Sequence, residues 1–141
     1  MKRELEDGYE LDDDPNRVDA AAVQQFLAND SYWARGRDLE TVRTIVHEAT
    51  RVVGLYHDDA LVGFCRAARC APRLFYLGDV YVLPHHRGRG LGKELVSEML
   101  ERGPLADAKW ILHTEDAHEL YRPFGFAEPD YKVMERPAPS A

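Results

Sequence analysis

Residues 79–95 read DVYVLPHHRGRGLGKEL, an order typical of a strand, a loop and a helix. Residues 80–82 are strand formers, and Pro84 ends the ladder because it has no N–H to donate. Apolar residues then recur at helical spacing, at positions 95, 96, 99 and 100. The glycines and cations between strand and helix are Gly88, Gly90, Gly92, Arg87, Arg89 and Lys93.

A glycine-rich loop that opens a helix predicts an anion site. Where no Cβ blocks the approach, backbone N–H groups converge on the anion, and the helix dipole adds positive potential. The three cations would strengthen that potential. The alternative is an ordinary loop whose charges are solvated. Because strand, glycines, cations and helix agree, the pattern favours phosphate binding.

Two common phosphate loops do not fit this spacing. A Walker A loop requires Gly at the position of Arg87 and Ser or Thr at the position of Glu94. The dinucleotide fingerprint G-x-G-x-x-G requires its third glycine where Lys93 stands. A nucleotide-binding module of another family is therefore disfavoured.

The pattern Arg87-x-x-Gly90-x-Gly92 resembles the Q/R-x-x-G-x-G/A signature of the GNAT superfamily of acyl-CoA-dependent N-acetyltransferases. Residues 117–126, AHELYRPFGF, are similar to its second signature, A-x-x-L-Y-x-x-x-G-F. With the order of the expected elements, the resemblance covers nearly the whole chain. It implies an α/β (α+β) fold in one GNAT-like domain, residues 1–141. The mixed, mostly antiparallel central sheet would be flanked by about four helices, with a parallel strand pair splayed at the coenzyme site.

The resemblance also implies acetyl-CoA as co-substrate and no metal. The loop amides would hold its pyrophosphate, and its pantetheine amide would pair with residues 81–83 as an added strand does. The cofactor-binding residues implied are Tyr81, Val82, Leu83, Arg87, Gly88, Arg89, Gly90, Leu91, Gly92, Lys93 and Thr114. Thr114 stands where family members commonly have Asn, and its hydroxyl can also donate a hydrogen bond.

The expected reaction is acetyl or short-acyl transfer to an amine by direct attack. The matching Tyr of the second signature implies that Tyr121 protonates the departing thiolate, although a packing role is the alternative. Asp79 is the only carboxylate on the central strand, since this chain lacks the Glu that some members use as a base. We expect it to act as the base and to line an acidic cleft for a cationic amine. His118 is the next candidate base or, alternatively, a surface histidine.

Composition limits the partners. With 45% hydrophobic and 30% charged residues, the chain is typical of a globular domain. Its net charge of -7 argues against binding to nucleic acid or to an anionic membrane, and it favours a cationic acceptor, either a small-molecule amine or a protein amine. No apolar run approaches about 20 residues and no signal-peptide core follows Met1, so we expect a cytoplasmic protein. A homodimer is compatible with the sequence. A non-catalytic acyl-CoA sensor is the rival function.

The remaining patterns predict the other elements. We expect an edge strand at residues 8–11, a solvated loop at 12–14, and helices at 19–27 and 39–49. Three antiparallel strands should follow, at 51–56, 61–67 and 73–82. A strand at 110–113, a helix at 117–124 with a capping box of Asp116 and Glu119, and a strand at 131–134 complete the set. The aromatic residues Tyr32 and Trp33 are predicted to plug the core or to line the acceptor pocket, and Cys65 and Cys70 to be reduced thiols.

Overall fold

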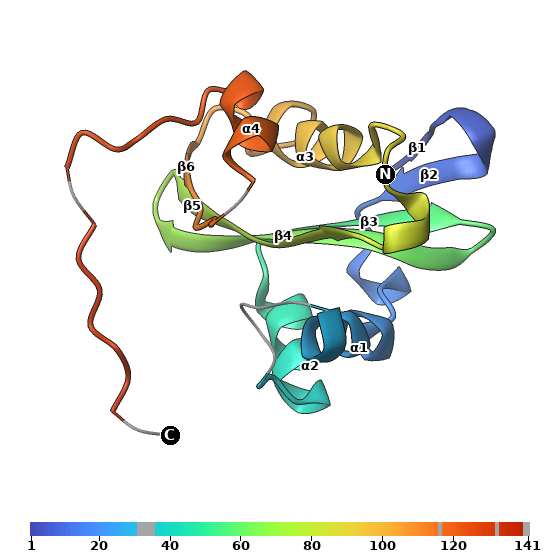
Figure 1. Cartoon of the computed structure of the whole chain (residues 1–141), viewed down its shortest axis with the longest axis horizontal. Helices are drawn as coiled ribbons and strands as arrows, with labels where there is room; N and C mark the ends of the chain where they lie inside the picture. The colour runs from blue at the N-terminus through green and yellow to red at the C-terminus, as the bar shows by residue number, and fades with distance from the viewer. Residues whose placement is uncertain (31–35, 116, 132, 140–141) are drawn as a thin grey trace.

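A six-stranded sheet with helices on both faces forms the molecule (Figure 1). The structure is a computed structural model that describes residues 1–30, 36–115, 117–131 and 133–139. The strands, in sheet order, are β1 (Lys2–Glu4), β2 (Tyr9–Asp12), β3 (Arg51–His57), β4 (Ala60–Ala71), β5 (Leu74–Val82) and β6 (Lys109–Ile111). The helices are α1 (Ala20–Asp30), α2 (Leu39–Glu48), α3 (Leu91–Glu101) and α4 (His118–Tyr121). All neighbouring strands are antiparallel except β5 and β6, which are parallel, so the predicted fold class is confirmed.

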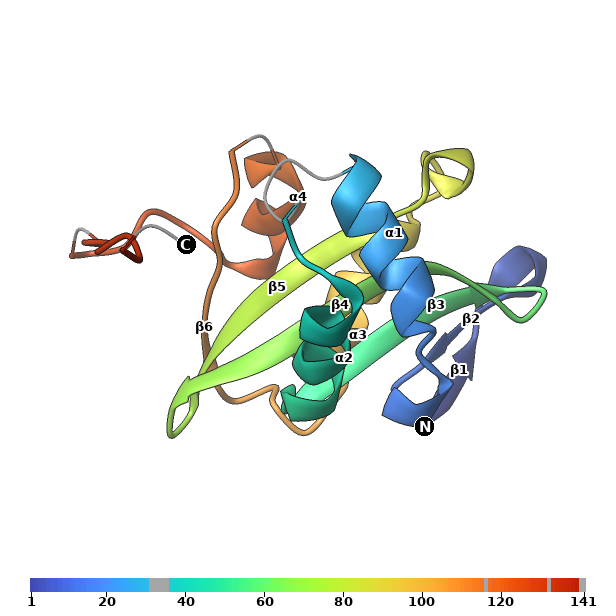
Figure 2. The same ribbon diagram turned by 90° about the horizontal axis from the view of Figure 1, so that it is seen from below.

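Each sheet face carries its own apolar cluster. On one face α3 buries Leu95, Val96 and Met99 completely, because these residues share one side of the helix. On the other face α1 and α2 bury Phe26 and Val42 against the strands. Each such side chain contributes about 1.5–3 kcal/mol. Figure 2 shows α1 and α2 over the middle of the sheet, with the part of β5 beside β6 left uncovered by either helix.

Local capping explains where two helices begin. The Asp19 carboxylate accepts from the N–H of Ala22 at 3.1 Å, as the sequence predicted. The Asp38 carboxylate accepts from the N–H of Thr41 at 2.8 Å and caps α2 in the same way. The Asp38 cap marks the end of the α1–α2 connection, in which residues 31–35 lie outside the described part of the chain.

The N-terminal predictions need correction. The expected edge strand is present as β2, but β1 covers it and forms the edge instead. The expected solvated loop at 12–14 is also wrong for two of its carboxylates. Asp12 is buried and paired with Arg17 at 3.0 Å, and Asp13 pairs with Arg51 at 3.2 Å. Three consecutive aspartates suggested a solvated loop, whereas Arg17, five residues from Asp12, and the distant Arg51 neutralise two of them.

The C-terminal predictions also need correction. No strand forms in residues 126–131 or 133–139, where Tyr131, Val133 and Met134 are 86%, 67% and 93% exposed. Apolar residues at 133 and 134 do not alternate, so they have no single face to bury. The helix expected at 117–124 is α4 followed by a 3-10 turn at Arg122–Phe124, since Pro123 cannot donate within a helix. Asp116, half of the expected capping box, lies outside the described residues.

Within the described ranges, no helix has both the length and the apolar character needed to cross a bilayer.

Candidate functional site

One edge of the central strand β5 pairs with another strand over only part of its length. It pairs with β6 through Leu74, Phe75 and Tyr76, whereas it pairs with β4 as far as Val82. No described strand pairs with that edge beyond Tyr76. The two parallel strands thus separate halfway along β5, and its C-terminal half offers unpaired backbone groups.

A bulge lies in this open half. Between the pairs Phe64↔Tyr81 and Arg66↔Gly78, β4 advances by two residues and β5 by three. Asp79 has a φ of +54°, a left-handed conformation that marks it as part of the bulge. The extra residue allows Tyr81 to face α1, where its ring stacks on Phe26 at 4.0 Å.

The direction of the backbone groups at the open edge follows from one bond. The N–H of Leu83 donates to Val62 of β4 at 2.8 Å. Because successive residues of a strand point their polar groups to opposite sides, the N–H and C=O of Val82 face the open side. The Nε of Arg87 donates to that carbonyl at 2.7 Å. The predicted pantetheine strand, residues 81–83, therefore includes an N–H directed into the opening.

The loop at the start of α3 has the geometry that the sequence predicted. Gly88 and Gly90 have φ values of +81° and +77°, and the carbonyl of Gly90 accepts from Glu94 at 3.2 Å. Among the described residues, none accepts a hydrogen bond from the N–H groups of residues 88–93. A Cβ on any of the three glycines would have no atom within 4 Å. Six free donors at a helix N-terminus suit a phosphate.

A histidine and a tyrosine support the turn that leads into this loop. The Tyr9 hydroxyl lies 2.7 Å from the Nδ1 of His86, in the 3-10 turn Pro84–His86. His57 stacks on the Tyr9 ring at 4.3 Å. Burial lowers the pKa of His86, and the neighbouring His57 and Arg89 lower it further. His85 is exposed, and the described residues contain no cluster of ligands for a metal ion.

The predicted catalytic residues of the second motif lie on α4. Tyr121 is buried, with its ring edge-on to Phe126 at 5.8 Å, and it belongs to the same apolar cluster as Val82 and Leu91. His118 is exposed. The Thr114 hydroxyl accepts from the N–H of Ala117 at 3.0 Å and stabilises the turn before α4. Tyr121 is thus the motif residue that the fold directs inward.

Asp79 lies in a different environment from the acidic cleft that we expected. Its carboxylate accepts from Arg37 at 2.8 and 2.9 Å and from Arg66 at 2.7 Å, and the residue is 6% exposed. These contacts argue against a role as general base, because both carboxylate oxygens already accept hydrogen bonds from guanidinium groups. The predicted acceptor residues Tyr32 and Trp33 lie outside the described part of the chain.

Sequence reasoning missed Arg66 and gave no role to Arg37. Arg37 belongs to the unusual segment YWARGR, residues 32–37, which was the available signal. No sequence pattern indicated a role for Arg66, because single arginines are common in strands. Only the pairing of β4 with β5 brings it to Asp79.

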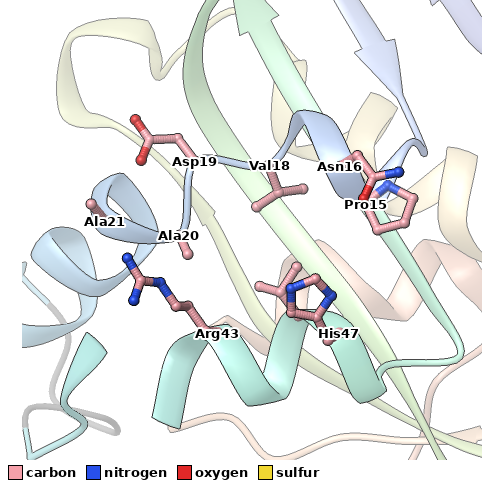
Figure 3. Close-up of a pocket in the computed structure, with 9 residues that line it drawn as sticks. Pro15, Asn16, Val18, Asp19, Ala20, Ala21, Arg43 and His47 are labelled. Atoms are coloured by element: carbon pink, nitrogen blue, oxygen red, sulfur yellow. The ribbon is translucent and has the colours of Figure 1, made fainter. Parts of the chain in front are cut away.

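A separate hollow lies between the start of α1 and the exposed side of α2 (Figure 3). Pro15, Asn16, Val18 and Asp19 line one side, and Arg43 and His47 the other. Arg43 pairs with Glu40 at 2.7 Å. None of the predicted site residues lines this hollow, so the α3 loop and the open edge of β5 remain the candidate site.

Comparison with known proteins agrees with this geometry. The model of the acetyltransferase (GNAT) family matches residues 9–126. A putative GNAT-family acetyltransferase from Xanthomonas campestris pv. campestris is 32% identical, with a TM-score of 0.84 over 93% of this chain and 94% of that one. A GNAT-family acetyltransferase from Brucella melitensis, solved in complex with acetyl-CoA, is 23% identical, with a TM-score of 0.68 over 85% and 83% of the two chains.

A third solved structure carries a named substrate class. It is an aminoglycoside acetyltransferase from an uncultured soil metagenomic sample, 21% identical, with a TM-score of 0.63 over 94% of this chain and 99% of that one. A comparison with curated proteins finds no match.

Proposed function

Because this chain belongs to the acetyltransferase (GNAT) family, we propose that it transfers an acetyl group from acetyl-CoA to the nitrogen of an amine acceptor. The observation that carries the proposal is the continuity of two ligand surfaces. Unpaired backbone at the open half of β5 leads directly, through residues 83–87, into the free N–H groups at the start of α3. An extended thioester with a pyrophosphate at one end has the shape to occupy both.

The backbone and the cations divide the binding of acetyl-CoA between them. The N–H groups of residues 88–93 donate to the pyrophosphate, and Arg89 and Lys93 add positive charge at the surface of the loop. Arg87 keeps the turn against β5 through its bond to Val82. The Val82 N–H then donates to the pantetheine amide. Two fixed ends hold the thioester in one orientation, which lowers the entropic part of the barrier.

The transfer proceeds by direct attack. The amine nitrogen forms a bond to the thioester carbonyl carbon, the C–S bond breaks, and the thiolate leaves with the electron pair of that bond. Tyr121 donates a proton to the thiolate and is reprotonated from solvent. The nitrogen loses one proton when the ammonium becomes the attacking amine and a second after the attack, so that one proton is released overall. An alkylamine with a pKa of about 10.4 is mostly protonated at pH ~7.4, so its deprotonation costs roughly 4 kcal/mol unless a base or water assists. His118 on α4 or a water molecule takes that proton, in place of the predicted Asp79.

The test combines binding and turnover. Purified protein is mixed with acetyl-CoA and a panel of small amines and amine-bearing peptides, and free thiol is measured over time. We expect thiol release that depends on one class of amine, with acetylated product confirmed by mass spectrometry. If acetyl-CoA binds and no amine is acetylated, the chain is an acyl-CoA sensor and the proposal fails.

A further inference from the structure

Two arginines share a single carboxylate on the α1–α2 side of the sheet. Asp79 accepts from Arg37 of the α1–α2 connection and from Arg66 of β4. The three side chains therefore carry one net positive charge. This charge lies within a chain whose formal net charge is -7. The local charge of this cluster is therefore opposite in sign to the net charge of the whole chain.

Several donors of this guanidinium pair, Arg37 and Arg66, are unused. Both Nη groups of Arg66, and the Nε and Nη2 of Arg37, donate to none of the described residues. The two side chains are only 14% and 26% exposed. A carboxylate that accepts from donors so partly shielded from water forms charge-assisted hydrogen bonds, which are stronger than neutral ones.

The guanidinium pair is held in place before any ligand arrives. Gly78 makes room for Arg66, since a Cβ at Gly78 would lie 3.0 Å from its Cζ. The Tyr76 ring centroid lies 5.9 Å from the same atom. The Arg37 backbone carbonyl accepts from Gln24 at 3.3 Å. Groups that are already fixed lose little entropy when a ligand binds.

The guanidinium pair also lies beside the opening in the sheet. Tyr76, next to Arg66, is the last residue of β5 that pairs with β6. Asp79 forms the bulge within the open half of β5, beside which the thioester is proposed to bind. Figure 2 shows α1 and α2 on one face of the sheet and α3 on the other. Because Arg37 belongs to the α1–α2 connection and pairs with Asp79, we place the guanidinium pair on the α1–α2 side of the open half of β5.

We propose that Arg37 and Arg66 bind a carboxylate of the acceptor, so that the preferred acceptors are amino acids or similar amines with an acid group. One negative charge balances the net charge of the cluster, and the two oxygens of a carboxylate match the donor geometry of a guanidinium. This inference rests on the proposed function and replaces the purely cationic acceptor that net charge suggested. The carboxylate is bound and is not altered in the reaction.

The first experiment compares matched acceptors. The common L-amino acids and β-alanine are each assayed beside their carboxamides, which keep the amine and the size but lack the negative charge. For the best acceptor we expect kcat/KM to be at least about tenfold higher for the acid than for the amide, mainly through KM. Equal values, or a preference for the amides, would overturn the inference and leave the proposed function standing.

The second experiment uses variants of the cluster. Arg66→Gln should lower kcat/KM for the acid by more than it lowers kcat/KM for the amide, so that the preference for the acid is lost. Gly78→Ala keeps every charge but displaces the Arg66 guanidinium, so it should reduce the preference in the same direction. Arg69→Gln is the matched control, because Arg69 is an exposed arginine on the same strand. An unchanged preference in both test variants would contradict the inference.

A binding measurement keeps the inference testable even without turnover. Calorimetric titration of the amino acid and its carboxamide into protein saturated with CoA should show tighter binding of the acid. If no amine is acetylated but the acid still binds selectively, the proposed function fails and the anion site remains. If the acid and the amide bind alike, or neither binds, the anion site itself is refuted.

Discussion

The α3 loop, residues 88–93, and the guanidinium pair of Arg37 and Arg66 both present N–H donors to an anion, but they are built in different ways. The donors of the loop are backbone groups of consecutive residues, which require only two glycines at positive φ and the start of a helix. The donors of the guanidinium pair come from two separate segments and converge on a buried carboxylate of a third. A local site and a tertiary site thus serve similar chemistry, and they should respond differently to mutation.

Tyr121→Phe should give the largest effect, and it lies in neither region. The variant keeps the buried ring and removes the hydroxyl, so turnover should fall by about 10²- to 10⁴-fold as the leaving thiolate loses its acid. Acetyl-CoA affinity should stay within about twofold, measured by titration. Tyr131→Phe, at a residue 86% exposed, is the control. Full turnover in Tyr121→Phe would leave Tyr121 as a packing residue only.

Asp79→Asn tests whether the ion pairs of Asp79 with Arg37 and Arg66 stabilise the folded protein. The change removes the charge that two guanidinium groups share, and we expect the free energy of unfolding to fall by about 3 kcal/mol, measured by urea denaturation. Asp107→Asn, at an exposed aspartate, should change it by less than about 0.5 kcal/mol. If Asp79→Asn is as stable as the parent and instead moves the pH profile of turnover upward, Asp79 is the base after all.

Gly92→Val tests the local site, where binding should be lost without loss of stability. A side chain at Gly92 would meet no protein atom within 4 Å, and its φ is not positive, so the fold should tolerate it. The same side chain would occupy the space of the bound phosphate. Coenzyme A at 100 times its dissociation constant should stabilise the parent by about 2.7 kcal/mol.

Thermal melts with and without ligand measure this effect. The ligand-induced increase in melting temperature should disappear in Gly92→Val and persist in Gly36→Val, a glycine with equally open surroundings. Gly90→Val is a less informative variant, because its φ of +77° strains any branched residue. An undiminished increase in Gly92→Val would remove the phosphate assignment.

The smallest expected effect concerns pH and the turn before the loop. Since the pKa of His86 is lowered in the folded protein, the unfolded chain binds more protons below pH 6.5. Stability should therefore decrease as pH falls through 6.5 toward the folded pKa, and acetyl-CoA affinity should weaken with it as protonation of the ring changes its contact with the Tyr9 hydroxyl. His86→Gln should flatten the pH dependence of the melting temperature. His85→Gln, the exposed neighbour, should leave it unchanged.

Periodicity and capping predicted the middle of the chain well because its signals are local. The hairpin of β3 and β4, the strand β5 and the helix α3 follow from alternation, turn residues and helical spacing within short windows. Prediction failed at both ends of the chain. Asp12 pairs with Arg17 across a turn and Asp13 with the distant Arg51, contacts that a run of three aspartates does not indicate. These two aspartates form ion pairs with arginines, whereas Val133 and Met134 pair with no strand among the described residues and remain exposed.

The sequence alone determined the family, the class of fold and the loop that opens α3, because glycine conformation and free helix-terminal amides are properties of consecutive residues. The tertiary structure decided the environment of Asp79. Strand pairing and the bulge in β5 bring two arginines to its carboxylate, and no pattern within one segment specifies which distant side chains will meet there. Electrostatic surroundings depend on distance in space, and so Asp79 lies between two arginines in place of the acidic surroundings that we expected.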